Sequence, residues 1–136
     1  MDKGYKNLEI FKLSRELAIE IHKMTLTLPK FEMYEEGSQI RRSSKSVPAN
    51  IVEGCCLRRH KNEYLQYLHR ALGSCEETSA HLTMLHEAKS LQDETLFKEL
   101  SDKYDRLGKM LFRFIESVVQ DHLSPKYVRE SSLDYE

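Results

Sequence analysis

The stretch that decides the fold is residues 39–61, QIRRSSKSVPANIVEGCCLRRHK. It holds six of the 21 Lys and Arg residues but only one of the 22 Asp and Glu residues, in a chain whose net charge is −1. Its local charge is therefore +5. Apolar and small residues recur through it at spacings of three and four, at Ile40, Ser44, Val47, Ile51 and Cys55. This spacing predicts a helix with a narrow inner face, which another helix can approach closely, and Pro48 predicts a bend in it.

Long amphipathic segments flank this stretch. The apolar spacing predicts four helices in all, over residues 8–28, 38–56, 62–90 and 93–122. We expect Asn7, Ser38, Asn62 and Asp93 to cap their N-termini. The third follows a heptad through Tyr64, Leu68, Ala71, Cys75, Thr78, Leu82 and Leu85. The fourth follows one through Phe97, Leu100, Tyr104, Leu107, Leu111, Phe114 and Val118. Because the connection at 90–92 is very short, these two helices should be antiparallel neighbours.

The totals limit the class of protein. The chain of 136 residues is long enough for one domain, and 40% apolar residues, 32% charged residues and only five Gly favour long helices over a sheet. It has no signal-peptide pattern and no apolar run of 18 residues, so we expect a cytoplasmic protein. The three cysteines make no disulfide framework, and we expect reduced, buried thiols. We predict one domain over 1–123 and a flexible tail over 124–136.

Some apolar residues lie outside the inner faces. Leu8, Ile19 and Leu26 lie roughly opposite the main apolar stripe of the first helix, and Phe112, Ile115 and Val119 form a second apolar flank late in the fourth. One interpretation is that these faces contact a neighbouring subunit. The other is that they are scattered apolar residues on the surface, which are common in proteins.

The residues point to no catalytic or metal site. A di-iron bundle needs Glu-x-x-His on two helices, and no glutamate here precedes a histidine by three positions. His81 and His86 are five apart and cannot share an ion without distortion. The acidic pairs Glu32/Glu35 and Glu99/Asp102 have the spacing of a magnesium-dependent nucleotide hydrolase, but a solvated charged face explains them better. We therefore expect no catalytic residue, no metal and no cofactor.

The basic stretch carries the main functional hypothesis. Its cations can contact phosphates of RNA or DNA without reading bases, and they are Arg41, Arg42, Lys45, Arg58, Arg59 and Lys61. A polar strip on the same helix could instead join subunits or serve a structural role, through Gln39, Arg42, Ser46, Asn50 and Glu53. For an arbitrary protein, a solvated basic face remains the plainer interpretation.

The motif Ser46-Val-Pro-Ala-Asn50-Ile-Val-Glu53-Gly54, after Gln39-Ile-Arg41-Arg42, resembles the signature of the four-helix-bundle proteins encoded in intervening sequences of bacterial 23S ribosomal RNA genes. Leu8 to Phe11, Leu28-Pro29 with Glu32 and Tyr34, and Tyr64 to Glu77 extend the similarity over roughly residues 5–120. That family is similar in turn to the accessory protein of diversity-generating retroelements.

The resemblance implies an all-α, up-down-up-down antiparallel four-helix bundle that assembles into a homopentamer. It also implies no enzymatic activity, a role in binding RNA or DNA, and a protein partner such as a reverse transcriptase. Three hypotheses follow: a nucleic-acid-binding oligomer, an oligomeric scaffold or protein adaptor without a nucleic-acid ligand, and a metal-dependent hydrolase. We rank the hydrolase last.

Overall fold

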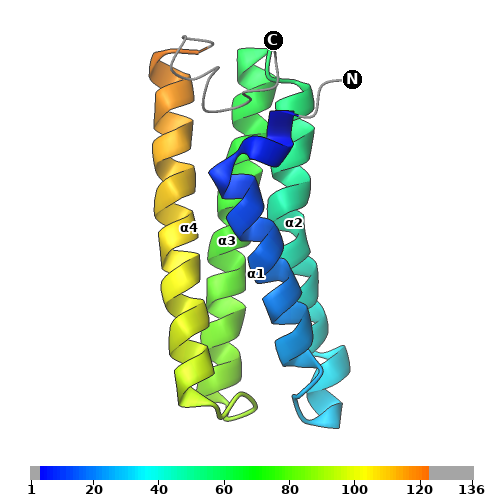
Figure 1. Cartoon of the computed structure of the whole chain (residues 1–136). Coiled ribbons are helices and arrows are strands. Elements are labelled where there is room, and N and C mark those ends of the chain that lie inside the picture. The colour runs from blue at the N-terminus through cyan, green and yellow to red at the C-terminus, as the bar shows by residue number, and fades with distance from the viewer. Residues whose placement is uncertain (1–3, 123–136) are drawn as a thin grey trace.

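The computed structural model describes residues 4–122, and this part of the chain is all-α. Four long helices lie side by side (Figure 1): α1 (Glu9–Thr25), α2 (Glu36–Cys56), α3 (Lys61–Glu87) and α4 (Glu94–Gln120). Two 3-10 helices, η1 (Gly4–Asn7) and η2 (Lys30–Tyr34), precede α1 and α2. The tail expected over 124–136 lies outside the described residues. Within residues 4–122, no helix combines the length and apolar character needed to cross a lipid bilayer.

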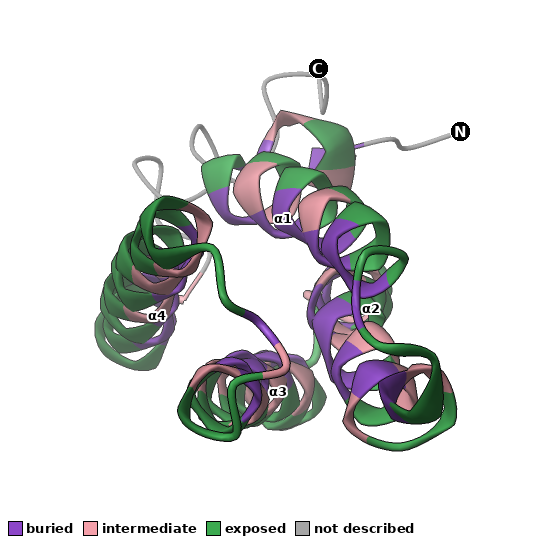
Figure 2. Cartoon of the chain, turned by 90° about the horizontal axis from the view of Figure 1, so that it is seen from below, coloured by how far each residue is buried: buried purple, intermediate pink, exposed green. Residues whose placement is uncertain are grey.

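The buried faces of the four helices meet in one core (Figure 2). All seven heptad positions predicted on α3 are buried, as are six of the seven on α4. The exception is Phe97, which is half-buried and stacks on the His86 ring at 3.8 Å between centroids. Heptad periodicity therefore locates the core correctly on both helices, because burial of apolar area is the main stabilising contribution to such a bundle.

The tightest pairing is between α2 and α3, and small residues produce it. The Thr78 hydroxyl donates to Ser43 Oγ at 2.8 Å, and Ser74 Oγ donates to Ser46 Oγ at 2.9 Å. These pairs show that α2 and α3 run antiparallel, since the partner number falls as the α2 number rises. The predicted narrow inner face is confirmed, because Ile40, Ser44, Val47, Ile51 and Cys55 are all buried.

Three of the four predicted helix caps are wrong. Asn7 lies in η1 and its Nδ2 is buried without a hydrogen-bond acceptor among the described residues, while Leu8 stands at the cap position of α1. His60, and not Asn62, precedes α3. Only Asp93 caps as predicted, with its carboxylate accepting from the backbone N–H of Leu96 at 3.0 Å.

α2 starts two residues before the predicted cap Ser38. The side chain of Glu32, four residues before the helix, caps its first turn instead. The Glu32 carboxylate accepts from the backbone N–H of Glu36 at 3.2 Å and from the Ser90 hydroxyl at 2.5 Å. It therefore ties η2 to the start of α2 and to the α3–α4 connection. The sequence analysis treated Glu32 as a solvated side chain, but it is buried. That prediction was wrong because the local sequence gives no sign of these distant partners.

α1 ends at Thr25, three residues before the prediction. The hydroxyls of Thr25 and Thr27 donate to the backbone carbonyls of His22 (2.8 Å) and Met24 (2.7 Å). The Met24 carbonyl also accepts from the backbone N–H of Thr27 at 3.0 Å, a bond three residues apart that tightens the end of the helix. Of the second apolar face predicted on this helix, Leu8 is buried in the core, whereas Ile19 and Leu26 are exposed. On α4, Ile115 is likewise buried while Phe112 and Val119 are exposed.

Candidate nucleic-acid interface

Two of the six predicted cations lie on the outer face of α2. Arg42 and Lys45 are exposed, three positions apart, on the side of the helix opposite its buried residues. Neither makes a hydrogen bond or an ion pair with the described part of the chain. Their charges are therefore available to an external anion.

Arg41, in contrast, is not a free surface cation. It is half-buried, and its guanidinium turns back to η2, where Nη2 donates to the backbone carbonyl of Met33 at 2.7 Å and Nη1 lies 3.5 Å from the Met33 sulfur. The guanidinium also lies close to Gly37, 3.2 Å from where a Cβ would stand. Arg41 therefore holds η2 against α2, and the carbonyl acceptor leaves its positive charge in place.

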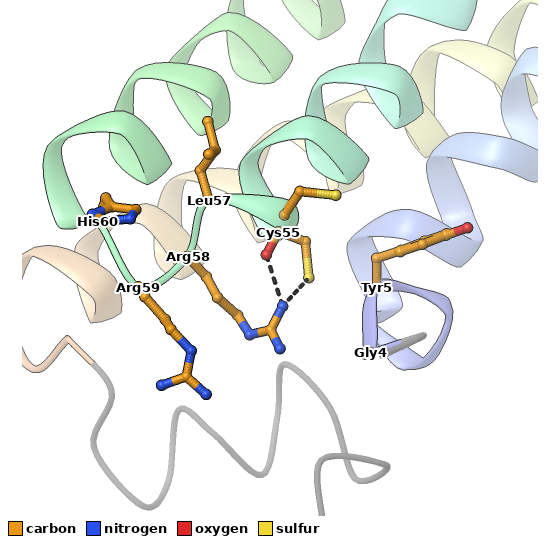
Figure 3. A pocket seen from close by; sticks show the side chains of 8 residues that line it. Gly4, Tyr5, Cys55, Leu57, Arg58, Arg59 and His60 are labelled. Carbon is orange, nitrogen blue, oxygen red and sulfur yellow. Dashed lines mark hydrogen bonds between the residues drawn. The ribbon is translucent and has the colours of Figure 1, made fainter. Parts of the chain in front are cut away.

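The corner between α2 and α3 positions the other three cations. Arg58 donates from Nη1 to the backbone carbonyl of Cys55 at 2.8 Å, at the end of α2 (Figure 3). Lys61 donates from Nζ to the backbone carbonyl of Val119 on α4 at 2.9 Å, and remains exposed. Arg59 is exposed, with no bond to the described residues. The carbonyl acceptor leaves the positive charge of Lys61 in place, so Arg59 and Lys61 keep the corner cationic.

A surface cavity of about 360 Å³ adjoins this corner. Cys55 to His60 line one side and Gly4 and Tyr5 of η1 the other, so the start of the chain lies beside the α2–α3 connection (Figure 3). The Tyr5 ring is fixed by an edge-on contact with Phe11, with 5.0 Å between centroids. The cavity is therefore lined by basic residues of the corner and by the Tyr5 ring.

Carboxylates do not neutralise the basic stretch in the part of the chain that the structure describes. The ion pairs found there are made by other cations: Lys12 with Glu9, Lys98 with Asp102, Lys103 with Glu20, and His81 and His86 with neighbouring glutamates. Arg42, Lys45 and Arg59 have no such partner. This local excess of positive charge is the electrostatic requirement for binding a polyanion.

The predicted polar strip is split between two environments. Asn50 Nδ2 donates to the Ser46 carbonyl and hydroxyl, both at 2.9 Å, and Ser46 in turn accepts from Ser74 of α3. These two residues therefore join helices within one chain. Gln39, Arg42 and Glu53 are exposed. The structure brings only Ser46 and Asn50 together, one helical turn apart.

The sequence prediction missed a cation on the neighbouring helix. The Arg70 guanidinium lies over the Tyr67 ring at 5.0 Å from its centroid, on the side of α3 that packs against α2. The spacing of three between an aromatic residue and an arginine on a helix was the available signal. Arg70 adds one exposed positive charge to the surface beside the Ser46–Asn50 pair.

The three thiols are free, but only two are buried as expected. Cys55 and Cys75 face the core, whereas Cys56 is exposed at the end of α2. Burial, reinforced by Glu76 and Asp105, raises the pKa of Cys75 to about 12. Within residues 4–122, no three side chains of His, Cys, Asp or Glu gather as a metal ion would require.

Comparison with known proteins decides the family. A family model described as 23S rRNA-intervening sequence protein matches residues 6–113, which includes all of α1, α2 and α3. The chain belongs to the family of 23S rRNA-intervening sequence proteins. The resemblance inferred from the α2 motif is therefore confirmed.

A solved structure supports the fold of this family member. It is a protein of unknown function from the S23 ribosomal protein family of Bacteroides thetaiotaomicron, 23% identical in sequence, with a TM-score of 0.69. The alignment covers 79% of the present chain and 98% of that chain. At this identity the likeness establishes the helical fold alone. A search of curated proteins found no match.

Proposed function

We propose that this family member is a non-enzymatic, oligomeric protein of the cytoplasm that binds RNA or DNA through the basic surface of α2 and the α2–α3 corner. One observation carries the proposal: Arg42, Lys45 and Arg59 are exposed and have no carboxylate partner among the described residues. Cations placed in this way contact phosphate oxygens, which every nucleic-acid sequence presents. The binding should therefore be strong at low salt and weakly dependent on sequence.

Assembly would multiply this effect. A pentamer, which the family resemblance implies, presents the basic surface of each chain five times, and linked sites bind one long anion more tightly than separate sites do. Lys61 contributes its charge from a fixed position at the corner. Arg41 adds its charge from the η2 side of α2, since the Met33 carbonyl that holds its guanidinium does not neutralise it.

The test compares alanine variants in binding a fluorescently labelled single-stranded RNA, measured by anisotropy at low salt. Arg42→Ala, Lys45→Ala and Arg59→Ala should each weaken binding by roughly 3- to 10-fold, as the loss of one phosphate contact does. The matched control is Lys98→Ala, since Lys98 is also exposed but is paired with Asp102 on α4. The proposed interface would be excluded if Lys98→Ala bound RNA as weakly as the other three variants, or if the natural protein did not bind RNA.

One observation favours a scaffold or protein adaptor as the second candidate. Arg42 and Glu53 are exposed side chains of opposite charge on the same face of α2, without partners in the described part of the chain. They could pair across a subunit boundary or with a protein such as a reverse transcriptase. In that case Glu53→Ala should dissociate the assembly in light scattering while Arg59→Ala leaves it intact, and neither variant should affect RNA binding because none occurs.

A further inference from the structure

One face of α2 leads from the exposed cations to the cavity at the α2–α3 corner. Arg42 and Lys45 are exposed on this face, and Cys56, exposed at the end of the helix, lines the cavity. Cys56 follows Lys45 by about three helical turns, so the two residues lie within about 20° of each other around the helix. The cavity therefore begins about 16 Å beyond Lys45 along the same face.

The path from Lys45 to the cavity carries little charge of its own. Ala49 and Val52 lie on this face between Lys45 and Cys56. Glu53 is the one acidic residue of 39–61, and it lies roughly 80° from Lys45 around the helix. No carboxylate of α2 therefore lies on the path itself, and a chain of phosphates can follow it.

The cavity combines basic side chains with an aromatic ring. Arg59 and His60 are exposed and line it from the corner, and Arg59 makes no bond to the described residues. Tyr5 lines the other side, from η1 (Figure 3). Its half-buried ring lies at 77° to the Phe11 ring, so no ring of the described residues stacks in parallel on it. A flat group from outside the chain can take that position.

The size of the cavity limits what can enter it. Its volume of about 360 Å³ is at the small end of the range for ligand pockets, which is about 300–1,000 Å³. One unpaired base suits such a space. A duplex does not, because it is far wider and keeps its bases stacked and paired inside.

We propose that the cavity binds one unpaired nucleotide of a single-stranded RNA or DNA. The base stacks on Tyr5, its phosphate contacts Arg59, and the neighbouring phosphates continue along α2 to Lys45 and Arg42. Proteins that bind single strands with little regard to sequence combine a basic path with aromatic rings in this way. This inference rests on the proposed function and names single strands, and not duplexes, as its ligand.

The thiol of Cys56 reports directly on whether the cavity is occupied. Cys55 and Cys75 are buried, so iodoacetamide should alkylate Cys56 alone, as followed by mass spectrometry. A short single-stranded RNA, in excess over the chains and at about ten times its Kd, should slow this alkylation by about 10-fold, because the cavity is then open in about one chain in ten. A duplex of the same sequence should leave the rate nearly unchanged. So should inorganic polyphosphate, which offers phosphates without a base.

A second measurement changes the ring. Tyr5→Leu removes the stacking and should weaken the binding of single-stranded RNA by about 5-fold or more, whereas Tyr5→Phe keeps the ring and should bind like the natural protein. Neither variant should change the slope of affinity against salt, since no charge is lost. The matched control is Tyr34→Leu, because Tyr34 is 82% exposed on η2, outside the cavity. Circular dichroism confirms that each variant is folded.

Three results would overturn the inference. RNA that binds but leaves Cys56 as reactive as in the free protein would show that the cavity stays empty. Equal protection by the duplex or by polyphosphate would show that no unpaired base is needed. Full affinity of Tyr5→Leu would show that the ring makes no contact. In each case, weaker binding by Arg42→Ala and Lys45→Ala would leave the proposed function intact, whereas a natural protein that binds no RNA would remove both.

Discussion

Tyr104 on α4 is a buried polar group whose hydroxyl has no hydrogen-bond partner among the described residues. Burial raises the pKa of this phenol above its ordinary range. An unsatisfied buried hydroxyl costs about 1–3 kcal/mol, and phenylalanine keeps the ring without that penalty. We therefore expect Tyr104→Phe to raise the free energy of unfolding by about 1 kcal/mol, measured by urea denaturation. A lower midpoint would indicate that the hydroxyl is satisfied in solution.

The burial of Cys75 predicts how the stability of the protein depends on pH. Its pKa is raised from 9.0 to about 12, so between these values the unfolded chain releases the proton while the folded chain keeps it. Stability is therefore complete below pH 9 and falls as the pH rises toward 12. Cys75→Ala should make this alkaline loss shallower, as read from urea midpoints at a series of pH values. An equally steep loss in the variant would place its cause elsewhere.

At the scale of single residues, the sequence predicted burial better than it predicted hydrogen bonds. The apolar periodicity identified Tyr64, Leu68 and Leu82 as core, because burial follows the helix period. It gave no sign that Arg41 bonds to Met33 or that Glu32 is buried beside Ser90, because these partners come from other elements. Such contacts depend on tertiary packing, and local spacing contains no signal for them.

At the scale of elements, the closeness of α2 and α3 can be tested with two glycines. A Cβ on Gly54 would stand 3.2 Å from the Cβ of Tyr67 and 3.3 Å from the Tyr64 ring, whereas one on Gly73 would meet nothing within 4 Å. Overpacking costs about 1–3 kcal/mol, while replacing an exposed helical glycine by alanine gains about 0.5–1 kcal/mol.

We therefore expect Gly54→Ala to lower the melting temperature and Gly73→Ala to raise it, both measured by circular dichroism. The two variants make the same chemical change in neighbouring helices, so each controls for the other. If both raised the melting temperature, the α2–α3 contact would be looser than the structure shows.

The elements themselves could be predicted to within a few residues, and their ends could not. The heptads located α3 and α4, and the short connection predicted their relative direction, but the start of α2 depends on the Glu32 carboxylate four residues before it. At the end of α1 the backbone changes to hydrogen bonds three residues apart, and the hydroxyls of Thr25 and Thr27 bond to carbonyls of the last turn. Side-chain hydrogen bonds to helix termini are worth about 1 kcal/mol, which is enough to move a boundary by a turn without changing the fold.

At the scale of the whole molecule, the proposed function depends on where the charge lies and not on its total. The chain has a net charge of −1, yet residues 39–61 contain six basic residues and one acidic residue. The structure leaves Arg42, Lys45 and Arg59 of this stretch unpaired within the described residues, and it holds Lys61 at the α2–α3 corner through a backbone carbonyl. The sequence located this charge, but only the fold shows which of these cations are unpaired and which, like Arg41, are held by another element.

The central claim is most directly tested by the salt dependence of RNA binding to the full chain. For single strands, the logarithm of the affinity falls with the logarithm of the salt concentration by about 0.7 per phosphate contact. We predict a steep line for the natural protein. For the variant in which Arg42, Lys45 and Arg59 are all alanine, the slope should be smaller by about 2 for each chain that touches the RNA. Equal slopes for the two proteins, or an affinity that does not change with salt, would contradict the account.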